Sequence, residues 1–388
     1  MKKIVANFYG YSPKKIGNEI DMQTSLADHL NQKGCELLWI FISCKYDELF
    51  ESYQRPGLDI EIVPFEKGGD VQLMLSILSI IRRRNVQVMH LQFIKPMTAM
   101  LLIILARVFL KKTAFIYHKR SPGTLINSRL SFKRHVSPLR VLSLFVDKII
   151  ANSDSIRENC LNRYVKPNKV VRIYNGTVMD KFENARDEAK IRTEFKIPQH
   201  YRIVSIIKDA RPEVGLRDLL SSIPKVLREF QEVVFLIVGG GIETESLKVL
   251  AAQLGIEGHV IFAGIRDDIP KIIAESFFTV DPSPVEAFGF VIIESMAGGR
   301  PVIAVNAWGP REIIVHGKTG LLVKPGKPTD FAQAITEMLN SPDKVKEMGV
   351  RSYLRVKDLF TIQKMSEETA KATVEVLSIR TGSGLRLG

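Results

Sequence analysis

The chain has 388 residues, enough for two domains at about 150 residues each, and carries a formal net charge of +13. Its 45% hydrophobic and 25% charged residues are ordinary for a globular protein, which excludes a disordered chain, a collagen and a coiled coil. The three cysteines, Cys35, Cys44 and Cys160, form no close C-x-x-C pair, so they exclude a disulfide scaffold and a structural zinc site and favour a reducing, cytoplasmic location.

Short apolar strands alternate with helical segments through the first 178 residues. The opening segment reads as a buried strand and not as a signal peptide, and the longest apolar run, 97–106, is shorter than the roughly 18 residues that a membrane-spanning helix needs. Apolar spacing predicts strands at 3–8, 37–42, 58–63, 86–91, 113–117, 146–151 and 170–173, with helices at 16–33, 71–84 and 97–110. Such strands between helices are typical of a parallel sheet covered on both faces.

The same pattern restarts after Asn175-Gly176 and the charged stretch 183–196. It predicts strands at 202–207, 233–238, 260–263, 277–280 and 301–305, with helices at 216–229, from 292 and at 362–377. We therefore expect an α/β protein of two doubly wound, Rossmann-like domains, residues 1–178 and 179–360. Residues 361–380 are expected to form a C-terminal helix that can pack back on the first domain, and residues 381–388 a disordered tail.

The positive charge lies almost entirely in the first half of the chain. Residues 1–180 hold 27 Lys and Arg against 15 Asp and Glu, whereas residues 181–388 hold 28 against 27. This asymmetry favours an anionic partner for the N-terminal domain, either a membrane surface, a phosphorylated substrate or nucleic acid, with a solubilising basic face as the plainer alternative. The basic stretch 119–140 is the candidate for peripheral contact with the cytoplasmic face of an anionic membrane.

The most informative stretch, residues 281–304, begins where an apolar strand ends. Pro282 and Pro284 predict an irregular loop, and Gly289 lets a ligand approach successive backbone N–H groups near a helix start. Glu286 lies in this loop and Glu294 eight residues later, so two carboxylates can hold two parts of one polar ligand. The plainer alternative is that Glu294 complements a helix dipole and Glu286 is a solvated loop residue.

Further motifs accompany this carboxylate pair. They are Pro282-Ser283, Phe288-Gly289, Pro301-Val302-Ile303, Gly309-Pro310-x-Glu312-Ile313, Gly317-x-x-Gly320-x-Leu322-Val323, Val238-Gly239-Gly240-Gly241 and Phe262-x-Gly264. As a set, these residues resemble the retaining glycosyltransferases of group 1 (family 4), closely over residues 145–345 and loosely over the N-terminal third. The resemblance implies the GT-B architecture, in which two Rossmann-like domains face a cleft.

The resemblance also implies a nucleotide diphosphate sugar, a UDP- or GDP-sugar, as donor substrate in the C-terminal domain, with no cofactor. Glu286 would contact the sugar hydroxyls and Glu294 the ribose hydroxyls. Backbone amides would hold sugar and phosphate oxygens at Phe288, Gly289, Phe290 and Val291, and the base would lie near Gly264 and Arg266. No two aspartates lie two residues apart, so the D-x-D metal motif is missing and we expect no metal.

One part of the family pattern is altered. The family places an Arg and a Lys five residues apart after the first strand of the second domain, where both neutralise the donor diphosphate. Aligned without a gap, these positions hold Asp209 and Val214, and with a one-residue shift they hold Lys208 and Glu213. The second register keeps one cation, with Arg211 or Arg217 as a candidate for the other. A carboxylate at Glu213 would oppose the diphosphate unless it turned away.

In the N-terminal domain the resemblance points to Gly17 and His118. Gly17 lies at a loop-to-helix junction where the family has a Gly-rich loop near the donor phosphates. His118 ends a strand, at a place where the family often has a His lining the sugar and acceptor site. A structural, hydrogen-bonded histidine is the alternative. His90, at the end of the preceding strand, is a comparable candidate.

We therefore expect a hexosyltransferase-type enzyme that retains the anomeric configuration, with His118, Glu286 and Lys208 as its catalytic residues. The basic domain favours a lipid-linked, phosphorylated or saccharide acceptor in surface polysaccharide or glycolipid biosynthesis. The alternative is a non-catalytic sugar- or nucleotide-binding homologue with a decayed diphosphate site. An oxidoreductase is disfavoured because Thr244 interrupts G-x-G-x-x-G, and nucleic-acid binding because stacking aromatics do not interleave the basic residues.

Overall fold

The computed structural model describes residues 2–10, 17–42, 55–63, 70–110, 112–121, 137–185 and 190–381. The chain divides into two compact units. Unit 1 contains Met1–Tyr174 and Ile362–Gly388, and unit 2 contains Asn175–Thr361. The division thus falls four residues before the expected boundary at 178, and the C-terminal helix belongs to unit 1. The expected tail lies, beyond residue 381, outside the described residues.

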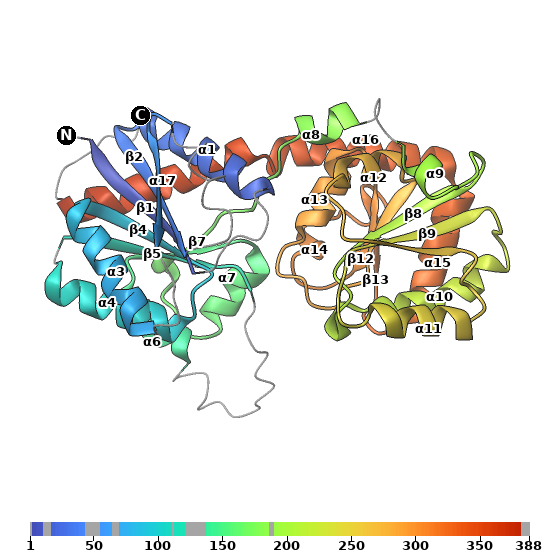
Figure 1. Cartoon of the computed structure of the whole chain (residues 1–388), viewed down its shortest axis with the longest axis horizontal. Coiled ribbons are helices and arrows are strands. Elements are labelled where there is room, and N and C mark those ends of the chain that lie inside the picture. Colours follow the sequence, from blue (N-terminus) through green and yellow to red (C-terminus); the bar gives the residue numbers. More distant parts are fainter. Residues whose placement is uncertain are drawn as a thin grey trace. The chain divides into compact units, whose positions relative to one another are not determined.

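Unit 1 is built on a parallel seven-stranded sheet in the order β3-β2-β1-β4-β5-β6-β7. Its strands are β1 (Lys3–Tyr9), β2 (Cys35–Ile42), β3 (Leu58–Val63), β4 (Val86–Gln92), β5 (Ala114–Lys119), β6 (Lys148–Ala151) and β7 (Val170–Arg172). Its helices are α1 (Gly17–Gln32), α3 (Asp70–Arg83), α4 (Pro96–Phe109), α6 (Pro138–Phe145), α7 (Asp154–Leu161) and α17 (Ile362–Thr381), with a short 3-10 turn η1 (Pro167–Lys169). Figure 1 shows α3, α4 and α6 on one face of this sheet and α1 with α17 on the other.

Helix α17 completes the core of unit 1 although it comes from the end of the chain. Its apolar side chains, among them Ala370 and Val376, pack into the same cluster as Leu30 and Trp39. Two ion pairs fix the helix against the sheet: Lys148 to Glu375 at 2.7 Å, and Arg380 to Asp147 at 2.7 Å. Burial of this apolar face supplies the driving force, because exposed ion pairs add at most about 1 kcal/mol each.

A pair of buried histidines lies between the sheet of unit 1 and α17. His90 Nδ1 of β4 is 2.8 Å from His118 Nε2 of β5, and His90 Nε2 is 3.0 Å from the Thr373 hydroxyl of α17. Burial lowers the pKa of His90 to about 3. Burial, and then the neighbouring His90 and Arg120, lower the pKa of His118 well below its usual value. Both rings are therefore neutral near pH 7.

Unit 2 is built on a parallel six-stranded sheet in the order β10-β9-β8-β11-β12-β13. Its strands are β8 (Arg202–Ile207), β9 (Val233–Val238), β10 (Val260–Gly264), β11 (Phe278–Asp281), β12 (Val302–Val305) and β13 (Gly320–Val323). The helical segments are α8 (Asp180–Glu183), α9 (Ile191–Glu194), η3 (Pro212–Val214), α10 (Leu216–Leu227), α11 (Thr244–Gln253), α12 (Ile269–Glu275), α13 (Phe290–Ala297), α14 (Pro310–Ile313), α15 (Pro328–Asn340) and α16 (Pro342–Leu359).

The strand order of unit 2 reverses between β8 and β11. The chain runs outward from β8 through β9 to β10, then returns to β11 beside β8 and continues through β12 to β13. In open parallel sheets, ligands bind outside the carboxyl ends of the strands at such a switch point. The segments after Ile207 and Asp281 meet at this point, so the predicted site residues near 208 and 286 lie together at the carboxyl ends of the strands, which we call the carboxyl edge of the sheet. The expected doubly wound α/β fold is confirmed in both units.

We expect unit 1 to lose stability as the pH falls below 6.5. Unfolding lets His90 bind a proton there, whereas folded His90 stays neutral down to a pKa of about 3. The unfolded state therefore gains protons, and the free energy of unfolding falls by about 1.4 kcal/mol per pH unit for each such imidazole. Urea unfolding followed by Trp39 fluorescence in a Trp308→Phe background measures this slope. His90→Gln should make the slope shallower between pH 6 and 4, and an unchanged slope would contradict the assignment.

Candidate functional site

A largely, though not fully, buried cation lies at the switch point of unit 2. Lys208 follows β8, and its Nζ lies 2.7 Å from Glu286 Oε2 and 3.3 Å from Asp281 Oδ2. Asp281 is the last residue of β11, and Glu286 stands in the loop that follows. The predicted residues Lys208 and Glu286 are thus brought together, and they are joined by an aspartate to which the sequence analysis gave no role.

Burial and the two carboxylates oppose each other at Lys208. Burial is the strongest single influence and lowers the pKa of the ammonium, but Asp281 and Glu286 together outweigh it, so the pKa is raised. The Lys208 side chain is 13% exposed, against 3% for Asp281 and 26% for Glu286. Lys208 is therefore charged at neutral pH, and the three groups together carry one formal negative charge. Of its three N–H donors, two meet these carboxylates, and the described residues offer the third no partner.

The loop between β11 and α13 is held by hydrogen bonds of its backbone and by a close approach that Gly215 permits. The Ser283 N–H donates to Asp281 Oδ1 at 3.0 Å, and the Gly309 N–H donates to the Glu286 carbonyl at 3.0 Å. Gly215 has φ 76°, and a Cβ there would lie 2.3 Å from the Pro282 carbonyl oxygen. A larger residue at 215 would therefore push the loop, and with it Glu286, away from Lys208.

Helix α13 begins with one face open. Gly289, at φ 116°, turns the chain into the helix, where the first N–H groups lack acceptors within the helix. Phe290 and Val291 are half-buried, and so is Glu294 one helical turn later, whereas Ile292, Ile293 and Ser295 are buried. The open face of α13 thus carries the N-terminal amides and the second predicted carboxylate together, which fits the expected contact with an anionic, hydroxyl-bearing ligand.

Phe288 contributes a buried ring and a backbone amide that is directed at Glu286. Its side chain is buried and packs edge-on against Phe360, with ring centroids 5.9 Å apart, and against Phe290 at 6.0 Å. Its backbone N–H lies 3.4 Å from Glu286 Oε1 and so points at that carboxylate. Phe288 therefore anchors the loop through its ring and orients Glu286 through its amide.

Of the two registers considered for the family's Arg and Lys positions, only the one with Lys208 and Glu213 supplies a cation. Val214 is apolar and buried, and Asp209 is acidic and exposed, so neither supplies a cation. The Glu213 side chain is 65% exposed and forms an ion pair with Arg211 at 3.2 Å, outside the Lys208 cluster. Glu213 is therefore turned to solvent, and the charge of Arg211 is partly offset by it.

The ends of β9 and β10 continue the same edge of the sheet. The Gly239 N–H donates to the Gly264 carbonyl at 2.8 Å, and a Cβ on Gly239 would meet the Lys208 carbonyl oxygen at 2.3 Å. Arg266 pairs with Asp268 at 2.7 Å and also with Glu194, so it braces α9 and α12. The next residue after Gly264, Ile265, is 70% exposed and gives this edge an apolar flank that the sequence analysis did not identify.

Gly17 and His118 belong to unit 1. Gly17 is the first residue of α1, so its predicted place at a helix start is confirmed. His118 is buried at the carboxyl end of β5 and contacts His90. The basic stretch 119–140 lies largely outside the described residues.

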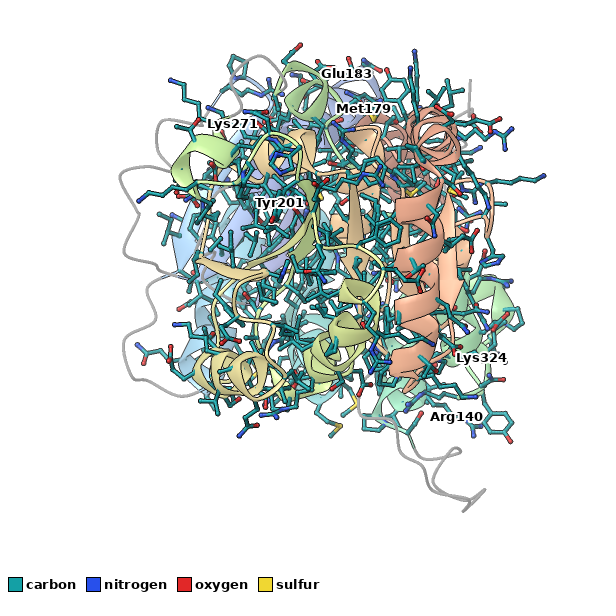
Figure 2. All side chains as sticks on the ribbon, turned by 90° about the vertical axis from the view of Figure 1, so that its right-hand side faces the viewer. Arg140, Met179, Glu183, Tyr201, Lys271 and Lys324 are labelled. Atoms are coloured by element: carbon teal, nitrogen blue, oxygen red, sulfur yellow. The ribbon has the colours of Figure 1, made fainter. Side chains whose placement is uncertain are left out.

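Two hollows of unit 2 lie beside α8. One, of about 590 Å³, is lined by Phe277 and Pro301, which precede β11 and β12, and also by Glu183 and Tyr353. The other lies between α8 and α12, beside Lys271. Figure 2 shows Met179, Glu183 and Lys271 gathered at one end of unit 2. The first hollow is thus near the amino ends of β11 and β12, away from the Lys208 cluster, whereas the second is lined by Asp268, the partner of Arg266.

Two properties of the described residues bear on cofactors and membranes. No three His, Cys, Asp or Glu side chains among them come together as a metal site. None of the described helices is both long enough and apolar enough to cross a bilayer.

Comparison with known proteins gives two family matches and several relatives. The model described as glycosyl transferases group 1 matches residues 187–355, and that of glycosyltransferase family 4 matches residues 23–181. The N-acetyl-alpha-D-glucosaminyl L-malate synthase of Bacillus anthracis is 29% identical over 60% of this chain and 60% of its own length. A GDP-mannose-dependent alpha-(1-6)-phosphatidylinositol monomannoside mannosyltransferase of Mycobacterium tuberculosis is 30% identical over 45% of this chain and 48% of its own. The chain therefore matches about half to three fifths of the length of these relatives.

Solved structures match over nearly the whole chain. Anabaena Alr3699/HepE, solved in complex with UDP, has a TM-score of 0.78 at 20% identity and covers 96% of this chain and 100% of that one. At this identity the likeness shows the shared fold. Because the two family models between them match most of the chain and the fold agrees over 96% of it, this chain belongs to the group 1, family 4 glycosyltransferases of GT-B fold.

Proposed function

We propose that unit 2 binds a nucleotide diphosphate sugar at the carboxyl edge of its sheet and that the enzyme transfers the sugar with retained anomeric configuration. The observation that carries this proposal is the contact of Lys208 with Glu286, a cation and a hydrogen-bond acceptor held together beside the open start of α13. The third N–H of Lys208 and the amides of α13 suit phosphate oxygens, and Glu286 suits sugar hydroxyls.

The other site residues take the remaining parts of the donor. Glu294, on the open face of α13, is placed to accept hydrogen bonds from a ribose diol. The exposed Ile265 beside Gly264 offers an apolar surface for the base. UDP in the Anabaena structure and GDP-mannose in the mycobacterial relative's name support a pyrimidine or a purine nucleotide equally.

The proposed reaction exchanges one bond at the anomeric carbon. Its bond to the diphosphate oxygen breaks while a bond to the acceptor oxygen forms on the same face, and the acceptor's proton passes to the leaving diphosphate. Lys208 stabilises the negative charge that develops on that leaving group. In this proposal the cation and the helix amides replace a metal ion.

The acceptor is proposed to be lipid-linked, phosphorylated or a saccharide. The names of the two relatives, a glucosaminyl malate synthase and a phosphatidylinositol mannoside mannosyltransferase, support small or lipid-borne acceptors with anionic groups. The excess of basic residues in 101–150 supports the same chemistry.

Contact with an anionic membrane through α4 forms part of the proposal. Ala99, Leu102, Ile103 and Ala106 bury one face of this helix, while Val108 and Phe109 at its end are 61% and 70% exposed. Exposed apolar side chains next to basic residues are typical of helices that lie on anionic bilayers.

Donor binding should depend on the Lys208 charge. We expect one of UDP, GDP, UDP-glucose and GDP-mannose to raise the melting temperature of the wild type, because at a hundred times its Kd a bound ligand adds about 2.7 kcal/mol to the free energy of unfolding. Lys208→Met should abolish this shift, and Lys208→Arg should retain most of it. A shift that survives in Lys208→Met would contradict the assignment. Tight donor binding without transfer or hydrolysis would favour the decayed-site alternative.

Glu286→Gln should lower kcat/KM by about tenfold to a hundredfold, because it weakens charge-assisted hydrogen bonds to the sugar while keeping the side chain's shape. Glu213→Gln is the matched control, since Glu213 faces solvent and should change kcat/KM by less than about twofold. Steady-state transfer assays on both variants check this. Equal effects of the two substitutions would remove Glu286 from the site.

Vesicle binding tests the membrane contact. Sedimentation with phosphatidylglycerol-containing vesicles should recover more protein than with neutral phosphatidylcholine vesicles, and added salt should weaken the binding. Phe109→Asp should reduce it, whereas Leu354→Asp, on an exposed position of α16 in unit 2, should not. Equal binding to both vesicle types would rule out the electrostatic contact.

A further inference from the structure

A chain of hydrogen bonds links three elements of unit 1 and ends at His118. The Thr373 hydroxyl lies 2.7 Å from the Thr369 carbonyl on α17 and 3.0 Å from His90 Nε2 on β4. His90 Nδ1 lies 2.8 Å from His118 Nε2 on β5. The side chains of Thr373 and His90 are fully buried, so water does not compete for these bonds.

The protons in this chain can be placed from its one fixed end. A carbonyl only accepts, so the Thr373 hydroxyl donates its proton to Thr369 and must accept from His90 Nε2–H. His90 is neutral, so its Nδ1 carries a lone pair and accepts from His118 Nε2–H. His118 is neutral as well, so its Nδ1 carries no proton.

We propose that Thr373 is a positioning residue: through His90 it holds His118 in the tautomer whose Nδ1 accepts a hydrogen bond, so that His118 orients a substrate hydroxyl group and donates no proton to the substrate. This inference rests on the proposed transferase function and on the sequence expectation that His118 lines the sugar and acceptor site. The described residues offer His118 Nδ1 no hydrogen-bond partner, and the ring is not fully enclosed, being 7% exposed. That nitrogen is therefore the one polar atom of the pair that is left for a ligand.

The relay gives α17 a role beyond packing. A histidine that can exchange tautomers presents either a donor or an acceptor to its ligand, and the wrong form turns a hydrogen bond into a repulsion between two lone pairs or two protons. Because Thr373 lies 283 residues from His90, the helix must be docked on unit 1 before the tautomer is fixed. The helix thus fixes the tautomer of His118 as well as contributing apolar surface to the core.

Long-range ¹H–¹⁵N correlation on histidine-labelled full-length protein reads the tautomers without any substrate. We expect both His90 and His118 to be neutral Nε2–H forms between pH 6 and 8, with assignments made from His90→Gln and His118→Gln. In Thr373→Val the His90 Nε2–H loses its acceptor, so both rings should move toward the Nδ1–H form. Thr373→Ser should restore the wild-type spectrum.

Activity is measured on the same variants with whichever of UDP-glucose and GDP-mannose supports transfer or hydrolysis. Thr373→Val should lower kcat/KM about tenfold, the size of one lost substrate hydrogen bond, and Thr373→Ser should recover it. Thr369→Val is the matched control, because its hydroxyl is also buried on α17 but bonds only to the Met365 carbonyl, at 2.7 Å. Thermal unfolding of all variants separates a loss of fold from a loss of positioning.

The outcomes distinguish the relay from the proposed function. An Nδ1–H form of either histidine in the wild type, an unchanged spectrum in Thr373→Val, or equal activity losses in the Thr373→Val and Thr369→Val variants would overturn the relay. If the spectra are as expected but His118→Ala leaves transfer unchanged, the tautomer is held as inferred and the placement of His118 beside substrate is wrong.

Discussion

The contact of Lys208 with Asp281 and Glu286 is the constraint on which unit 2 depends. It joins the ends of two strands that are adjacent in the sheet but 73 residues apart in the chain, and it places a charge where solvent hardly reaches. Removing one partner of such a buried group costs about 3–5 kcal/mol, because the remaining charges lose their compensation. The same contact therefore stabilises the switch point and arranges the groups that a donor would meet.

This arrangement also explains how the chain can depart from its family's pattern of two cations. Val214 and Asp209 carry no positive charge, so the cation comes from Lys208, one residue earlier than the ungapped alignment places it. Glu213 avoids the site by pairing with Arg211 in solvent. The single cation has a consequence for binding. Lys208 already contacts two carboxylates, so a bound diphosphate must compete with Asp281 and Glu286 for the same ammonium group.

Unit 1 shows the corresponding dependence on a distant segment. Its sheet is formed by the first 172 residues, but its core is closed by α17, whose Thr373 reaches the buried histidine pair. Packing and hydrogen bonding are coupled here, because the hydroxyl meets His90 only when the apolar face of the helix is seated on the sheet. Without the Thr373 hydroxyl, the fully buried His90 Nε2 would lose its partner, which makes the seating of α17 specific.

The sequence by itself determined the two doubly wound domains and the family, and it singled out Glu286 and Glu294 as candidates, because apolar periodicity, strand length and motif spacing are local properties of the chain. It missed β13, a four-residue strand that starts at a glycine and is stabilised by pairing with β12. It left open which register supplies the cation, gave Asp281 and Thr373 no role, and treated His90 and His118 as separate candidates. These points were decided by tertiary structure alone, because each depends on a contact between segments far apart in the chain, and side-chain direction at a strand end is set by what packs against it.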